Sequence, residues 1–230
     1  ALIEDPVFAI NAKIYQLTNI EIDNITFDGS DISRTNFDGI PSMVAGTFKL
    51  KFLEGHQFAY SFFSRNRSDM YLYYNKELTV NENLELFPDI EKYISNTSLN
   101  NKLKENWWGL SWAKSLSPNF SIGASLFFSI YDFNGGNNKQ FSAINENNQV
   151  AFYNYTRSFQ QKSNGIFAKI AAAWVLPKVA LGVNIDLPYL EINSTGKYRY
   201  EEYLSGFETL DDIFTYNDFN DINSKRKYPL

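Results

Sequence analysis

Apolar and polar residues alternate along much of the chain, which is typical of β-strands with two different faces. Between residues 120 and 130, for example, Phe120, Ile122 and Leu126 share one face, while Ser121 and Ser125 share the other. Helical periodicity is hard to find, so we expect an all-β fold. The alternating stretches are residues 44–52, 58–74 with a break at residues 65–68, 108–113, 120–130, 166–174 and 179–187.

The two ends of the chain are less regular than its middle. Residues 1–41 contain expected strands at residues 7–17 and 20–27, followed by a turn cluster at residues 28–31. Residues 42–200 hold the clear strands. Residues 201–230 are expected to form an acidic, aromatic extracellular loop, centred on residues 211–219, and the start of a further strand. Because no repeat or linker interrupts the pattern, we expect a single domain over residues 1–230.

The lengths of the expected connections differ between the two ends of the strands. Short connections at residues 53–56, 115–118 and 176–178 alternate with long polar ones at residues 80–103, at 134–149 and after 187. Outer-membrane β-barrels have short periplasmic turns and long extracellular loops. This asymmetry favours an antiparallel transmembrane β-barrel, or a large part of one. A soluble β-sandwich, whose strands also alternate, stays open as an alternative.

The composition agrees with strands that face both lipid and water. The 230 residues include 20 Phe, 15 Tyr and 4 Trp, yet the mean hydropathy of −0.34 is ordinary. No stretch approaches the roughly 20 apolar residues of a membrane helix. The net charge of −5 argues against a nucleic-acid binder. With no Cys and one His, the chain offers no disulfide, thiolate or multi-His site.

Residues 165–188, with residues 191–196, resemble a hairpin of the FadL-type outer-membrane transporters of hydrophobic compounds. The resemblance lies in a tight turn followed by Gly182, Pro188 and Gly196. Residues 41–50 and 107–123 are similar to the same family as it occurs in Bacteroidota-like sequences. The resemblance covers most of residues 40–200 and implies a bacterial outer-membrane channel for hydrophobic or amphipathic solutes such as fatty acids, without catalysis or cofactor.

The chain departs from that family in three respects. It lacks a recognisable N-terminal hatch, it offers only about eight to nine strands, fewer than the barrel of that family has, and it does not stop on a strand with a terminal aromatic residue. We therefore expect a partial chain of a larger barrel. A complete small barrel of about eight strands stays open.

Lysine side chains on a lipid face would cost roughly 2–4 kcal/mol near the bilayer midplane. Lysines on the small-residue faces of the strands are therefore expected to point into the lumen, where they pair with Asp186 or bind the carboxylate of a ligand. Aromatic residues on the same register would line the interior. The lumen-facing ligand-binding candidates are Lys49, Lys51, Phe63, Tyr71, Tyr73, Phe127, Lys169 and Asp186.

Other residues suggest contacts outside the lumen or sites of different chemistry. Asp132, Asn134 and Asn137 are expected in an oxygen-rich loop that could hold Ca²⁺, although Asn, Asp and Gly are also common turn residues. His56, the only histidine, lies in an expected turn without a nucleophile beside it, so we expect no enzyme. Amphipathic aromatic rings are enriched at membrane interfaces. The interface candidates are Trp108, Trp112 and Trp174.

The expected partners are outer-membrane lipid and lipopolysaccharide, a hydrophobic small molecule and envelope proteins, but no nucleic acid. A second function remains open, that of a non-transporting barrel subunit or docking platform in a larger envelope complex. A third is a soluble β-sandwich binding module.

Overall fold

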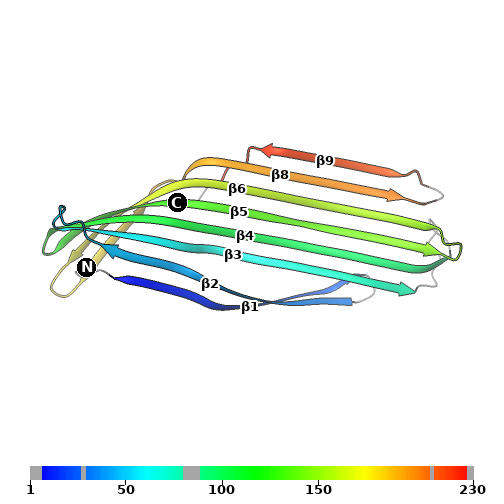
Figure 1. The fold of residues 1–230 in the computed structure, drawn as a ribbon, viewed down its shortest axis with the longest axis horizontal. Coiled ribbons are helices and arrows are strands. Elements are labelled where there is room, and N and C mark those ends of the chain that lie inside the picture. The colour runs from blue at the N-terminus through cyan, green and yellow to red at the C-terminus, as the bar shows by residue number, and fades with distance from the viewer. Residues whose placement is uncertain (1–6, 27–29, 80–88, 208–209, 227–230) are drawn as a thin grey trace.

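The computed structural model describes residues 7–26, 30–79, 89–207 and 210–226. These residues form one antiparallel, nine-stranded sheet in the order β1-β2-β3-β4-β5-β6-β8-β9, with β7 also paired to β6 (Figure 1). The all-β, antiparallel expectation is confirmed. Within the described residues β1 and β9 are not paired with each other, and no second sheet packs on the first. The strands are β1 Phe8–Thr26, β2 Ser30–Phe48, β3 His56–Thr79, β4 Ile90–Ser117, β5 Phe120–Asn145, β6 Val150–Val175, β7 Ala180–Asp186, β8 Leu190–Ser205 and β9 Ile213–Ile222.

The central strands are longer than the alternation predicts. β4 has 28 residues, and β5 and β6 have 26 each. Long loops were expected at residues 80–103, at 134–149 and after 187. Residues 90–103 lie in β4, residues 134–145 lie in β5, and β8 begins at Leu190, with only residues 187–189 between it and β7. Residues 80–88 are outside the described part. The loop expectation is wrong there because ladder hydrogen bonds join backbones whatever the side chains. Consequently, the β5–β6 connection at the supposed long-loop end is as short as those at the other end.

Both ends of the chain also differ from expectation. Residues 8–26 form the single strand β1, where two strands were expected. The expected acidic loop at residues 211–219 mostly belongs to β9, which pairs with β8. Strands β7 and β8 lie along successive parts of β6, separated by residues 187–189.

Side-chain and backbone preferences fix the tight turns. At the β5–β6 turn, Asn145 Oδ1 accepts hydrogen bonds from the backbone N–H groups of Asn147 and Gln149. Asn148 follows in the left-handed region with φ of 58°, which Asn tolerates better than most residues. At the β2–β3 turn, Gly55 has φ of 73° and avoids the steric cost that a Cβ would bring there.

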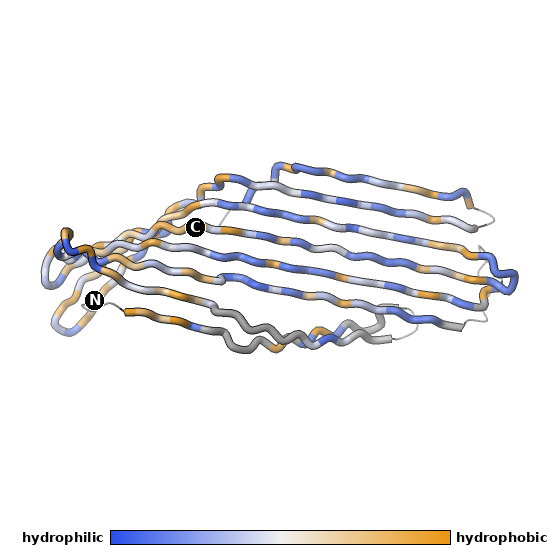
Figure 2. Tube along the Cα trace, in the orientation of Figure 1, coloured by the Kyte–Doolittle hydropathy of each residue, from blue (hydrophilic) through white to orange (hydrophobic). Residues whose placement is uncertain are grey.

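The two faces of the sheet differ in the half that ends at the β2–β3, β4–β5 and β6–β7 turns, which we call the turn half. Figure 2 shows apolar residues gathered in this half and hydrophilic ones dominating the other, the polar half. One surface of the turn half, the apolar face, exposes large apolar side chains. The opposite surface, the cluster face, carries the aromatic cluster described below. The apolar face exposes Tyr60, Trp108, Leu110, Leu126, Phe128, Ile130, Ile170 and Trp174.

A small apolar core lies at the far end of the polar half. Ile90, Ala143 and Ala151 are buried there, with Tyr93 and Phe207 packed against them. In the described residues no helix has the length and apolarity needed to cross a membrane.

Candidate functional site

Four neighbouring strands contribute an aromatic cluster to the cluster face. Phe63 of β3 lies opposite Trp107 of β4, and Phe127 of β5 lies opposite Phe167 of β6. The Phe127 and Phe167 rings stack with centroids 5.0 Å apart, and the Trp107 ring meets Phe167 edge-on at 4.5 Å. Phe127 and Phe167 are buried. The cluster therefore supplies much of the packing on this face of the turn half.

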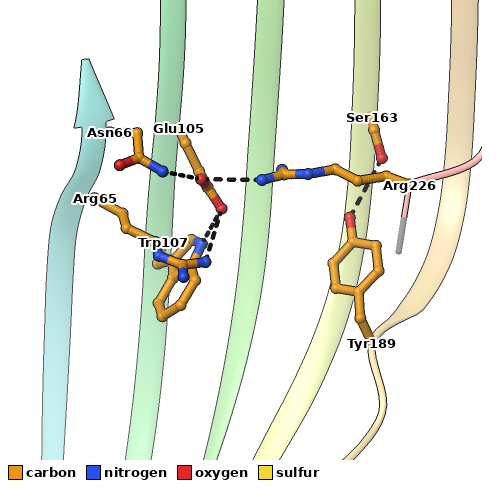
Figure 3. Close-up of polar contacts among 7 residues, drawn as sticks. All are labelled: Arg65, Asn66, Glu105, Trp107, Ser163, Tyr189 and Arg226. Atoms are coloured by element: carbon orange, nitrogen blue, oxygen red, sulfur yellow. Dashed lines mark hydrogen bonds and ion pairs between the residues drawn. The ribbon is translucent and has the colours of Figure 1, made fainter. Parts of the chain in front are cut away.

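A buried carboxylate lies beside the cluster, on the side of the polar half. Glu105 is fully buried. Its Oε1 accepts a hydrogen bond from Trp107 Nε1 at 2.8 Å and lies 3.5 Å from Arg65 Nη1. Its Oε2 accepts one from Asn66 Nδ2 at 2.8 Å and lies 3.0 Å from Arg226 Nη2 (Figure 3). Donors and cations on both oxygens offset the cost of burying the charge.

A β-bulge places two of these partners. Ser64 pairs with Asn106 and Asn66 with Glu105, so Arg65 is the extra residue of β3. A bulge changes the direction of the side chains along its strand. Here it brings Arg65 and Asn66 together at Glu105, and the guanidinium of Arg65 lies 4.4 Å from the centre of the Trp107 ring.

The segment of residues 223–226, which follows β9, also contacts the cluster face. Gln161 Nε2 donates a hydrogen bond to Ser224 Oγ. The backbone N–H of Arg226 donates to Glu191 Oε2 at 2.9 Å, and the guanidinium lies 3.8 Å from the centre of the Tyr131 ring. From the last residue of β9, the segment thus reaches across β8, β6 and β5 to Glu105 on β4 (Figure 3).

Ser163 and Tyr189 extend this polar network on β6 and beside it. Ser163 is buried, and its hydroxyl donates to Glu191 Oε2 at 3.1 Å. The hydroxyls of Ser163 and Tyr189 are 3.3 Å apart (Figure 3). The carboxylate of Glu191 therefore joins the sheet to the backbone of Arg226.

The structure brings together only some of the predicted lumen residues. Phe63 and Phe127 share the cluster face. Lys169 and Asp186 share it too and form the expected ion pair, with Lys169 Nζ 2.9 Å from Asp186 Oδ1. Lys169 also lines a hollow of about 390 Å³ in the turn half. Small side chains leave that space open. They include Ala59, Ser111, Ala113, Gly123, Ser125 and Ala171.

The expected face is wrong for Tyr71 and Tyr73. Tyr71 pairs with Asn100, whereas its neighbour Leu72 pairs with Leu99, which has the same strand parity as Glu105. The bulge at Arg65 shifts the alternation by one residue, which reverses the faces of everything after it. Tyr71 and Tyr73 consequently lie exposed on the side opposite Phe63 and Phe127, and Leu72 is buried.

Lys49 and Lys51 do not lie on a strand. β2 ends at Phe48, and both lysines belong to the exposed β2–β3 connection. The expected inward direction on a strand is therefore wrong for them, because the chain turns earlier than the alternation of residues 44–52 predicts.

The weak metal candidates do not form one site. Asp132, Asn134 and Asn137 lie in the middle of β5, not in a loop. Successive side chains of a strand point to opposite faces, so Asn137 points away from the other two. Lys162 Nζ lies 3.9 Å from Asp132 Oδ2. In the described part of the chain no group of three or more metal-ligating side chains gathers.

The three tryptophans that were candidates for the membrane interface all lie on the apolar face, as the alternation along their strands predicts. The Trp108 ring packs on Phe62 with centroids 4.7 Å apart, and Trp174 packs on Phe120 at 4.8 Å. Trp112 Nε1 donates a hydrogen bond to His56 Nδ1 at 2.8 Å. His56 is the first residue of β3, whereas the sequence indicated a turn at this position.

Sequence reasoning missed the polar network around Glu105. Glu105 shares the parity of Trp107 and Gly109, so extending the alternation of residues 108–113 backwards would have placed it on the cluster face. No signal of this kind exists for Arg226, which reaches the network from a segment without strand pairing.

No family model matches the chain, and neither a curated protein nor a solved structure matches it.

Proposed function

We propose that this sheet is part of the wall of an outer-membrane β-barrel of the FadL type, which passes hydrophobic or amphipathic solutes without covalent chemistry. The observation that carries the proposal is the exposed apolar face, which covers one side of the turn half of the sheet. Trp108, Leu110 and Leu126 are each more than half exposed on it. A monomeric soluble protein rarely exposes a contiguous apolar patch larger than a few hundred Å².

The height of the apolar face fits a bilayer. On β5 the apolar positions run from Phe120 to Ile130. At about 3.3 Å per residue this stretch is roughly 35 Å long, and a strand tilt of about 40° reduces it to roughly 25 Å along the membrane normal, the height of the apolar band of known outer-membrane barrels.

In the polar half the same surface carries charged pairs. Lys102 Nζ lies 2.9 Å from Asp69 Oδ2, and Lys92 Nζ lies 3.0 Å from Glu77 Oε1, both between β3 and β4 in the polar half. Such pairs are stable in water and costly in hydrocarbon. We therefore place the turn half in the membrane and the polar half outside it.

The cluster face supports the proposed passage of an amphipathic solute. The hollow beside Lys169 adjoins the aromatic cluster, so a polar group near the ion pair and an apolar group near Phe127 could be held together. Closure of the wall requires further strands or another chain, since β1 and β9 are edges within the described residues.

A specific observation also favours the second function, that of a non-transporting subunit or docking platform. Residues 223–226 lie across the cluster face and contact four of its strands. A lumen that this segment closed permanently would not conduct. The residues that the structure describes form a single sheet, in contrast, and offer no second layer for the β-sandwich of the third alternative.

Neighbouring tryptophans on opposite faces allow a direct test of the membrane proposal. In the full chain, three of the 4 Trp are replaced by Phe, leaving either Trp108 on the apolar face or Trp107 on the cluster face. Lipids brominated on their acyl chains should quench Trp108 strongly and Trp107 weakly, because bromine quenches at short range. Equal quenching, or a chain that remains folded and monomeric in plain buffer, would refute the membrane location.

Transport needs a separate assay. Vesicles that contain the full chain should release a trapped amphipathic fluorescent anion faster than empty vesicles do. Inserted protein that leaves the rate unchanged would favour the platform function over the channel.

A further inference from the structure

We infer that Glu105 and Tyr131 form a guanidinium-binding site, and that Arg226, whose backbone N–H also donates to Glu191, fills it as a detachable latch which closes the passage along the cluster face. The role of the latch in closing a passage rests on the proposed function. The binding site itself rests only on the contacts of the described residues.

The sheet builds this site without help from the segment that fills it. Asn66, Trp107 and Arg65 all hold the carboxylate of Glu105 from strands β3 and β4. These contacts fix its direction and leave Oε2 facing the guanidinium of Arg226 at 3.0 Å. Only Arg226 comes from outside the sheet, so the site is organised before the latch arrives.

The geometry suits a guanidinium better than an ammonium ion. The Tyr131 ring lies 3.8 Å from Arg226 Cζ, within the range of a stacked cation–π contact. A planar guanidinium can stack on the ring while it donates in its own plane to Glu105, whereas an ammonium group is a compact, strongly hydrated charge. Glu191 adds an acceptor for the backbone N–H of the same residue.

The contacts of the segment indicate that it can leave. Residues 223–226 make no strand ladder, and their sequence Asn-Ser-Lys-Arg has no large apolar side chain to bury. The described contacts to the sheet are hydrogen bonds, the stacking of Arg226 on the Tyr131 ring and the charged pair between Arg226 and Glu105. A charged pair is the strongest kind of polar contact among them. Losing this pair should therefore release the segment while the sheet remains folded.

The position of the latch gives it a consequence for transport. It extends from Glu191 beside β6 to Glu105 on β4 and thus crosses the central strands. Glu105 lies next to Trp107, at the border between the polar half and the aromatic cluster. A solute that moves along the cluster face from one half to the other has to pass this line.

A spin label can test the latch directly, because the chain has no native Cys. Lys225→Cys in the full chain carries the label next to Arg226, at an exposed position. We expect an immobilised spectrum in this parent and a mobile one after Arg226→Gln or Glu105→Gln. Glu202→Gln, which removes a carboxylate that contacts Tyr153 away from the segment, is the matched control and should leave the label immobile.

The same label tests the preference for guanidinium. Guanidinium added to the parent, below concentrations that unfold it, should mobilise the label, and ammonium at equal ionic strength should not. Arg226→Lys should bind the segment more weakly than arginine. A label that stays immobile in Arg226→Gln, or that responds equally to both ions, overturns the site. Arg226→Gln leaves the sheet residues intact, so it remains informative if Glu105→Gln fails to fold.

Release of the anion from vesicles then tests the closing role. Arg226→Gln should raise the rate several-fold over the parent. A mobile label with an unchanged, measurable rate overturns the closing role. If the parent and the variant both fail to conduct although the label is released, it is the proposed channel that fails, and the guanidinium site stands.

Discussion

Replacing Phe127 by alanine tests whether the aromatic cluster holds the central strands together. Phe127 is 8% exposed, and its ring stacks on Phe167 with centroids 5.0 Å apart. A phenylalanine buries about 150–250 Å², so at about 25 cal/mol/Å² its burial is worth roughly 4–6 kcal/mol as an upper bound. Buried Phe→Ala changes cost about 3–5 kcal/mol. Because neighbours on this open face can partly close the gap, we expect about 3 kcal/mol.

The assay for this change is urea unfolding of the full chain in lipid vesicles, followed by tryptophan fluorescence. The free energy of unfolding comes from the midpoint and the slope of the transition. Phe214→Ala is the matched control, since Phe214 on the edge strand β9 is 66% exposed and should lose no more than about 2 kcal/mol. If Phe127→Ala lowers the free energy of unfolding no more than Phe214→Ala does, the cluster is not the packing centre that we describe.

Two further predictions concern close contacts. A Cβ at Gly109 would lie 2.5 Å from Phe127 Cε1, so Gly109→Ala should lower the free energy of unfolding by about 1–3 kcal/mol. Gly182 has open space around it, so Gly182→Ala should lower it much less, and equal losses would contradict the prediction. Burial and the hydrogen bond to Glu202 raise the pKa of Tyr153 from 10.0 to about 12, so the stability it contributes is complete below pH 10 and lost as the pH rises through about 12. Tyr200 also donates to Glu202, which raises its pKa to about 12. Glu202→Gln should therefore lower the pKa of both tyrosines in a tyrosinate absorbance titration, and an unchanged titration would contradict the role of Glu202.

The alternation of the sequence predicts the turn half of the sheet well and the polar half poorly. In the turn half one face of each strand is apolar, so the period of two is visible in residues such as Leu126 and Phe128. In the polar half both faces are hydrophilic, and the stretch from Asn134 to Asn138 has the composition of a turn. It is nevertheless strand, paired on both sides with β4 and β6. Cross-strand backbone pairing, which leaves no mark on composition, decides the structure there.

The sequence does not predict the faces of β3 after residue 65 or the long-range contacts, for different reasons. The single extra residue Arg65 reverses the expected faces of Tyr71 and Tyr73. The break in the alternation at residues 65–68 indicates an irregularity there, but it does not tell how many residues are extra. Phe63, which precedes the bulge, keeps its expected face. The contact between Arg226 and Glu105 joins residues at great separation along the chain and depends on where β9 leaves the sheet. The alternation therefore predicts neither the reversal of the faces nor this long-range contact.

The charges that border the apolar face bear on what covers it. Such a surface must be shielded from water by lipid or by protein. Directly beyond Ile130, the row across β3 to β6 on the same side holds Arg67, Lys104, Asp132 and Lys162, three cations and one anion. If another protein covered the apolar face, these cations would lie at the edge of the interface without a defined role. A membrane places them at the depth of anionic headgroups, where each basic residue gains about 1 kcal/mol, so the position of this row favours lipid as the cover.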